Sequence, residues 1–204
     1  MDAAALIDDV TDDQQTELSR IGSSKLLYAD TRGEMDEETV YATAAAREAA
    51  ASETFAAWAD DENHAEAAAL FADAADDASA RLDALDADPA DWTPAMHDPL
   101  DDIDGTAARL GGLLGWTLVD KKVKEQLTGF FTGQADPQTA STFRSAGSDV
   151  LDLREEVTDL LDIVCADDAD WERAQESANA VIEAAYDEFF STLENLGVNP
   201  KPVC

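Results

Sequence analysis

The chain is poor in cations, cysteine and histidine, and each shortage excludes a class of protein. Its 204 residues include 13 Lys and Arg against 46 Asp and Glu, which gives a formal net charge of −33. Binding to nucleic acids or to anionic membranes depends on Lys and Arg, so we expect neither partner. The two cysteines, Cys165 and Cys204, are too few for a disulfide framework, and the terminal PKPVC lacks the spacing of a prenylation signal.

Targeting and nucleotide-binding signatures are also missing. The N-terminal MDAAALIDDV lacks the basic region and the long apolar run of a secretory signal. The longest weakly polar stretch, residues 110–119, is about half a membrane span. The sequence contains no P-loop, G-x-G-x-x-G, C-x-x-C or H-E-x-x-H motif. We therefore expect a cytoplasmic protein without a membrane segment.

The composition indicates a folded protein with an unusual surface. Hydrophobic residues make up 45% of the chain and recur at regular intervals, which disordered acidic tails do not show. An acidic surface over an ordinary core, with lysine scarce, is typical of halophilic proteins. In about 1 M salt the Debye length falls to roughly 3 Å, so self-repulsion is screened. The net charge therefore indicates the salt environment of the protein more than its function.

Helical spacing of apolar residues runs along almost the whole chain, and strand patterns are nearly absent. The predicted helices span residues 11–30, 37–59, 62–85, 101–132, 138–164 and 168–196, and an extended tail follows over 197–204. Three prolines mark residues 86–102 as the clearest loop. The sequence thus predicts one all-α domain over 1–204. Its core is a four-helix bundle over about 37–164, with a long crossover between the second and third bundle helices and a flanking helix at each end.

A weak internal repeat supports this organisation. Four residues of the first half share their spacing with four of the second: Glu48, Ala51, Phe55 and Trp58 with Asp120, Val123, Leu127 and Phe130. A second set of residues also shares one spacing: Phe71, Ala75 and Ala78 with Phe143, Gly147 and Val150. Two similar helix pairs are what a bundle with a crossover would contain.

The first helix pair resembles that of the rubrerythrin and ferritin-like superfamily. In that family a Glu is followed by a small residue three positions on and an aromatic residue seven on, and Glu48, Ala51 and Phe55 match this pattern. The family's second helix opens with an aromatic residue and a small residue four on, as do Phe71 and Ala75. The chain is also similar to ferritin-like proteins of salt-adapted archaea. The resemblance implies a ferritin-like four-helix bundle.

The resemblance also implies a carboxylate-bridged di-iron site, built from one Glu on each of two helices and an E-x-x-H motif on each of the others. Carried onto this chain, the single-Glu positions are Glu48 and Asp120. The E-x-x-H positions are occupied by residues that do not bind metals: Ala78 with Arg81, and Val150 with Leu153. The metal ligands of the family are therefore lost at those positions.

A shift of one residue would offer carboxylates instead of the lost ligands. The resulting metal candidates are Glu48, Asp76, Asp120 and Asp149, an oxygen-only set that suits hard cations better than a redox-active iron pair. The two histidines, His64 and His97, fall outside these positions. We expect no cofactor, with iron or manganese as the alternative.

Two further residues have ordinary structural interpretations. His64 lies near Asp60, Asp61 and Glu62, and is expected at the start of a helix rather than in a metal site. Cys165 follows Ile163 and Val164, and is expected to be a small core residue rather than a nucleophile.

Three of the five lysines lie close together, at Lys121, Lys122 and Lys124. One interpretation is a docking patch for an acidic partner or a phosphate. The other is a set of ion pairs with carboxylates of neighbouring helices. The sequence leaves both open.

These observations predict a protein without catalytic residues that acts through protein–protein contacts or self-association, as an accessory or regulatory protein. The alternative is a divergent di-metal oxidoreductase, or an iron-handling protein of the rubrerythrin type. The enzyme requires the four candidate carboxylates to converge on metal ions. The binding protein requires the four carboxylates to point at solvent instead. Fold alone does not fix activity.

Overall fold

The computed structural model describes residues 1–200, and over that range the chain forms nine helices and no strand. The helices are α1 (Ala3–Asp13), α2 (Gln15–Ile21), α3 (Lys25–Asp30), α4 (Glu37–Asp61), α5 (Ala65–Leu85), α6 (His97–Asp101), α7 (Thr106–Gly133), α8 (Pro137–Val164) and α9 (Asp168–Asn195). The all-α prediction is confirmed. Within residues 1–200, no helix is both long enough and apolar enough to cross a membrane. Cys204, at the end of the predicted tail, lies outside the described residues.

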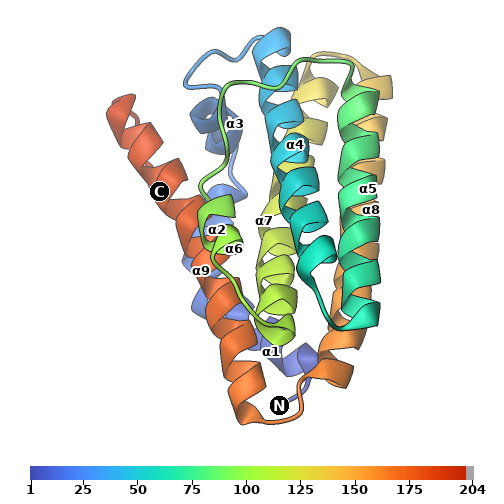
Figure 1. Cartoon of the computed structure of the whole chain (residues 1–204). Helices are drawn as coiled ribbons and strands as arrows, with labels where there is room; N and C mark the ends of the chain where they lie inside the picture. Colours follow the sequence, from blue (N-terminus) through green and yellow to red (C-terminus); the bar gives the residue numbers. More distant parts are fainter. Residues whose placement is uncertain (201–204) are drawn as a thin grey trace.

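Two antiparallel helix pairs make up the main body of the molecule (Figure 1). Helix α4 packs along α5, and α7 packs along α8, with a short turn inside each pair. Residues 86–105 connect the pairs by running back along the length of the molecule, and they contain α6. Helix α9 packs along another side of α7, and the three N-terminal helices contact α7, α8 and α9.

The N-terminal region differs from the single helix predicted over 11–30. Three short helices replace it, and the first begins at Ala3 because the Asp2 carboxylate accepts a hydrogen bond from the backbone N–H of Ala5. The chain then turns at Gln14 and again over residues 22–24. Each short helix can thereby bury its own pair of apolar side chains: Leu6 and Val10, Leu18 and Ile21, Leu26 and Leu27.

The crossover also contains more helix than predicted, because α6 lies inside the expected loop. Helix α7 begins at Thr106 rather than at residue 101, after Gly105, whose φ of +93° favours glycine. Helix α8 begins almost where predicted. Asp136 accepts hydrogen bonds from the N–H groups of Gln138 and Thr139, and Pro137 occupies the first helical position.

Aromatic side chains join the two helix pairs at two levels. At one level the ring centroids of Phe55 in α4 and Trp116 in α7 lie 5.2 Å apart, and Trp58 contacts Phe71 within the first pair at the same distance. At the other level Phe131 contacts Tyr41 and Phe143, with centroids 5.0 and 5.5 Å apart. Between these levels, along both α4 and α7, the interior contains charged residues.

Candidate functional site

Glu48 of α4 and Asp120 of α7 meet inside the bundle, between the two aromatic levels. Both residues are only 3% exposed. The amino group of Lys124, one helical turn beyond Asp120, bonds to Glu48 Oε1 and lies 3.0 Å from Asp120 Oδ1. Lys124 is itself 2% exposed, so a lysine ammonium lies buried between two buried carboxylates.

Arg81 of α5 completes this network. Its Nε donates a hydrogen bond of 2.9 Å to Glu48 Oε2, the oxygen that Lys124 leaves free. Burial lowers the pKa of Arg81, but the negative charges of Glu48 and Asp120 outweigh that effect and raise the pKa above its ordinary value. Two carboxylates thus face two cations, and the buried charge is neutral overall. Among the described residues, Asp120 Oδ2 has no hydrogen-bond partner.

The residues around this network do not fit a di-metal centre. The position between Glu48 and Asp120 is filled by the Lys124 ammonium. Ala78 and Val150, at two of the positions where the family carries ligands, are buried apolar side chains, and Arg81 at a third is a cation. Over residues 1–200, no group of three or more His, Cys, Asp or Glu side chains could hold a metal ion. We therefore derive no metal chemistry from this network.

The other two metal candidates do not join the network. Asp76 lies exposed on α5, and Asp149 lies exposed on α8. The structure thus brings together two of the four predicted carboxylates, and it places Asp149 instead in the wall of a surface groove. The expectation that all four point at solvent in a binding protein is wrong for Glu48 and Asp120, which are buried.

The three clustered lysines have different environments. Lys124 points into the network, so it cannot form part of a docking patch as predicted. Lys121 and Lys122 remain half-buried at the surface, and their amino groups lie 3.1 and 3.9 Å from the two carboxylate oxygens of Glu125. The surface part of the predicted patch is therefore two lysines that share one carboxylate.

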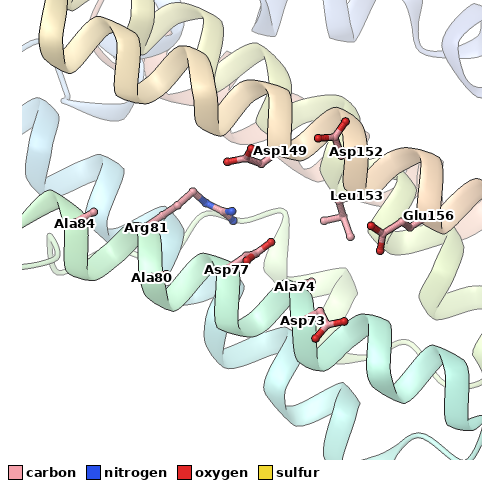
Figure 2. Close-up of a pocket in the computed structure, with 10 residues that line it drawn as sticks. All are labelled: Asp73, Ala74, Asp77, Ala80, Arg81, Ala84, Asp149, Asp152, Leu153 and Glu156. Carbon is pink, nitrogen blue, oxygen red and sulfur yellow. The ribbon is translucent and has the colours of Figure 1, made fainter.

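A groove of about 480 Å³ runs between α5 and α8. Figure 2 shows Asp77 and Arg81 extending from α5 toward α8, where Asp149 and Leu153 face them. Five carboxylates and one cation line the groove, together with small or apolar side chains: Asp73, Asp77, Asp149, Asp152 and Glu156, then Arg81, then Ala74, Ala80, Ala84 and Leu153. The alanines of α5 leave space beside Arg81 and Asp77, because their side chains are too short to reach α8.

A second hollow, of about 320 Å³, adjoins the groove and shares Arg81, Ala84 and Asp149 with it. Its wall includes Glu48 and the apolar side chains of Leu85, Phe143 and Ala146. Arg81 therefore belongs both to the groove and to the buried network. Glu48 of the network lines this second hollow and not the groove itself.

Sequence reasoning missed the role of Arg81. The ion pair between Lys124 and Glu48 of the neighbouring α4 agrees with one of the two interpretations of the lysine cluster. The signal for Arg81 is that it is the lone cation of an Ala- and Asp-rich helix, at a position where the family carries a ligand. The signal for Lys124 is its spacing of one turn from Asp120, which favours an ion pair on one helix face.

The residues outside the network have structural roles. The His64 ring nitrogen accepts a hydrogen bond from the backbone N–H of Ala67, so His64 caps α5. His97 is buried and its Nδ1 shares a hydrogen bond of 2.9 Å with the Thr54 hydroxyl. Burial and nearby carboxylates raise the pKa of the Cys165 thiol to about 11, which keeps it protonated at neutral pH.

Comparisons with protein-family models, with curated proteins and with solved structures give no match to this chain.

Proposed function

We propose that the protein is a ferritin-like bundle without enzymatic activity, which acts by binding a partner protein. The ferritin-like part of this proposal is supported by the order of α4, α5, crossover, α7 and α8, and by the meeting of Glu48 and Asp120. The absence of enzymatic activity is supported by Lys124 and Arg81, which neutralise the two carboxylates that a metal would need.

The groove between α5 and α8 is the proposed binding site, and its lining carries the proposal. Carboxylates on both walls favour a segment rich in Lys or Arg, and the alanines and Leu153 favour small or apolar residues between the cations. A second copy of this chain, with its net charge of −33, is a poor match for an acidic groove. We therefore propose a basic segment of a different protein as the partner.

The test uses a fluorescent peptide of alternating Lys and Ala, with binding followed by anisotropy at a salt concentration where the protein is folded. Replacing Asp77→Lys and Asp152→Lys places repulsive charges on both walls of the groove. Replacing Asp8→Lys and Asp9→Lys, both exposed on α1, changes the net charge equally and serves as the matched control. We expect the groove variant to bind about tenfold more weakly, and the control to bind nearly as wild type does.

Equal loss of affinity in the two variants would mean that the peptide responds to net charge alone, and the groove would then not be the site. Both variants experience the same screening at a given salt concentration, and the difference between them is largest at the lowest salt at which the protein is folded.

Lys121 and Lys122 define a second surface for an acidic partner, because two cations there share the single carboxylate of Glu125. The variant with Lys121→Glu and Lys122→Glu tests it by capture of partners from a lysate kept at molar salt. Unchanged capture would exclude this surface.

The alternative di-metal oxidoreductase is tested by metal content after purification in high salt without a His-tag. An enzyme of this class would contain about two equivalents of iron or manganese, lost on Glu48→Ala. We expect far less than one equivalent, with no change in the variant, because Lys124 already neutralises Glu48 and Asp120.

A further inference from the structure

The buried network uses only one edge of the Arg81 guanidinium. Nε donates a hydrogen bond of 2.9 Å to Glu48 Oε2, and among residues 1–200 this is the only hydrogen bond of the Arg81 side chain. The terminal amino groups therefore have no acceptor among the described residues, although the side chain is only 18% exposed. Two terminal N–H groups of a guanidinium are parallel donors, and this geometry binds both oxygens of a carboxylate.

The hollow beside Arg81 has an apolar wall opposite this cation. It measures about 320 Å³, and Leu85 of α5 lines it together with Phe143 and Ala146 of α8. Phe143 and Ala146 are buried, so helix packing fixes this wall. The space is large enough for an apolar side chain of the size of leucine. A ligand that fits the hollow therefore has a carboxylate next to a compact apolar group.

We propose that the hollow receives the carboxyl-terminal residue of the partner, so that Arg81 binds the terminal carboxylate and the last side chain packs against Leu85 and Phe143. The inference rests on the proposed function, because the rest of the partner is the basic segment that binds in the adjoining groove. It restricts that segment to the end of a chain whose last residue is apolar.

The groove and the hollow are continuous, since Arg81, Ala84 and Asp149 line both. One extended segment can therefore occupy the two together. Cationic side chains before the terminus would lie between Asp77 and Asp149, which extend from opposite walls (Figure 2). These cations offset the repulsion between the terminal carboxylate and the acidic groove. The charges thus suit a segment that is basic along its length and ends in one anion.

Two peptides that differ only at the carboxyl terminus test the inference. Each alternates Lys and Ala, ends in Leu and has a fluorescent label at its N-terminus, and one is the free acid while the other is the amide. We expect the acid to bind about tenfold more tightly, measured by anisotropy in the salt used for the groove test. Net charge predicts the opposite order, because the amide has one more positive charge and the protein has a charge of −33.

The variant Arg81→Lys keeps a cation near Glu48 and removes the paired terminal N–H groups. We expect the preference for the acid to fall below about twofold in this variant. Arg144→Lys is the matched control, because Arg144 is exposed on α8 and lines neither the groove nor this hollow. The control should keep the preference of the wild type. A terminal Gly in place of Leu should weaken binding of the acid about fivefold.

Equal binding of the two peptides to the wild type overturns the inference, as does a preference for the acid that persists in Arg81→Lys. If Arg81→Lys does not fold, the order of the two peptides on the wild type decides alone. Failure of the groove is measured separately, with Asp73→Lys and Asp152→Lys, because these two residues line the groove but not the hollow. That double variant should weaken binding of both peptides and keep their ratio.

If neither peptide binds, the groove proposal fails, and N-acetylleucine tests the hollow by itself. A rise in the unfolding midpoint of the wild type with sodium N-acetylleucinate, beyond that with sodium acetate at equal concentration, supports the hollow. The same rise in Arg81→Lys, or no rise in the wild type, contradicts it.

Discussion

Lys124 is the residue on which the buried network depends, because it alone bonds to both carboxylates. Arg81 reaches only Glu48 and is partly exposed, so it cannot replace Lys124 beside Asp120. Removing one partner of a buried ion pair leaves an uncompensated charge, and this costs far more than the intact pair contributes. The network is therefore a condition for folding more than a source of stability.

The substitution Lys124→Met keeps the length and the apolar stem of the side chain and removes its charge. We expect the free energy of unfolding to fall by about 3–5 kcal/mol, measured by chemical denaturation at neutral pH. Lys122→Met, at the surface, should change it by less than about 1 kcal/mol. Adding Asp120→Asn to Lys124→Met should recover part of the loss, since no unpaired charge then remains. A loss in Lys124→Met no larger than in Lys122→Met would contradict this account.

His97 makes the stability depend on pH. Burial, and then the positive charge of Arg47, lower the pKa of His97 from 6.5 to about 4. The unfolded chain therefore takes up the proton first, and stability is lost as the pH falls from about 6.5 toward 4. The free energy of unfolding of wild type minus that of His97→Asn removes the contribution of the carboxylates, which both proteins share. We expect this difference to change by roughly 3 kcal/mol between about pH 6.5 and pH 4. A difference that stays constant with pH would show that His97 is not the cause.

At the scale of elements, α7 is the centre of the molecule. Residues 107–120 are all buried, because the helix packs against α8 and α9 and faces α4 across the aromatic and charged layers. Gly111 and Gly115 permit the close approach of α9, since a Cβ atom at either position would collide with the backbone of Ala174 or Ala178. Two glycines in the interior of a helix, normally unfavourable, are here required by packing.

Gly111→Ala should therefore force α7 and α9 apart, and we expect a loss of about 1–3 kcal/mol in the free energy of unfolding. Gly129→Ala is the matched control in the same helix, because an added Cβ there meets nothing within 4 Å. That variant should be more stable than wild type by about 0.4–1 kcal/mol, measured by thermal or chemical unfolding. Effects of the same sign in the two variants would mean that the close approach does not matter.

The sequence predicted the long helices well, because a 3.6-residue period sustained over more than twenty residues has no competing interpretation. The prediction of a single helix over residues 11–30 was wrong. The helical period is weak there, and the Asp2 cap and the turn at 22–24 divide the region into short helices. At the site, the convergence of Glu48 with Asp120 followed from the sequence only as a condition of the alternative enzyme. The inward direction of Lys124 and the groove between α5 and α8 depend on packing between distant helices, which a single sequence does not encode in any local pattern.

At the scale of the whole molecule, the charge of −33 lies over a core of ordinary apolar composition. The buried carboxylates Glu48 and Asp120 have cationic partners in Lys124 and Arg81, and the partly buried Asp30 pairs with Arg47. Most of the remaining acidic residues are exposed. Exposed charges of one sign repel one another in the compact state, and this cost decreases with added salt.

We therefore expect the unfolding midpoint to rise as KCl increases from 0.1 to 2 M, followed by circular dichroism. A variant in which the exposed residues of α1 are neutralised, with Asp8→Asn, Asp9→Asn, Asp12→Asn and Asp13→Asn, should show a flatter salt dependence. If both proteins respond identically, exclusion of salt from the surface rather than screening governs the effect.

The lysine within the bundle has a consequence for how this protein matures. A protein whose interior charge is balanced by an ion must acquire that ion after synthesis, so its supply of finished molecules follows the supply of the ion. Here the balancing charge is a side chain of α7 and is present as soon as the chain is made. The balance of this interior charge therefore requires no ion from outside the chain.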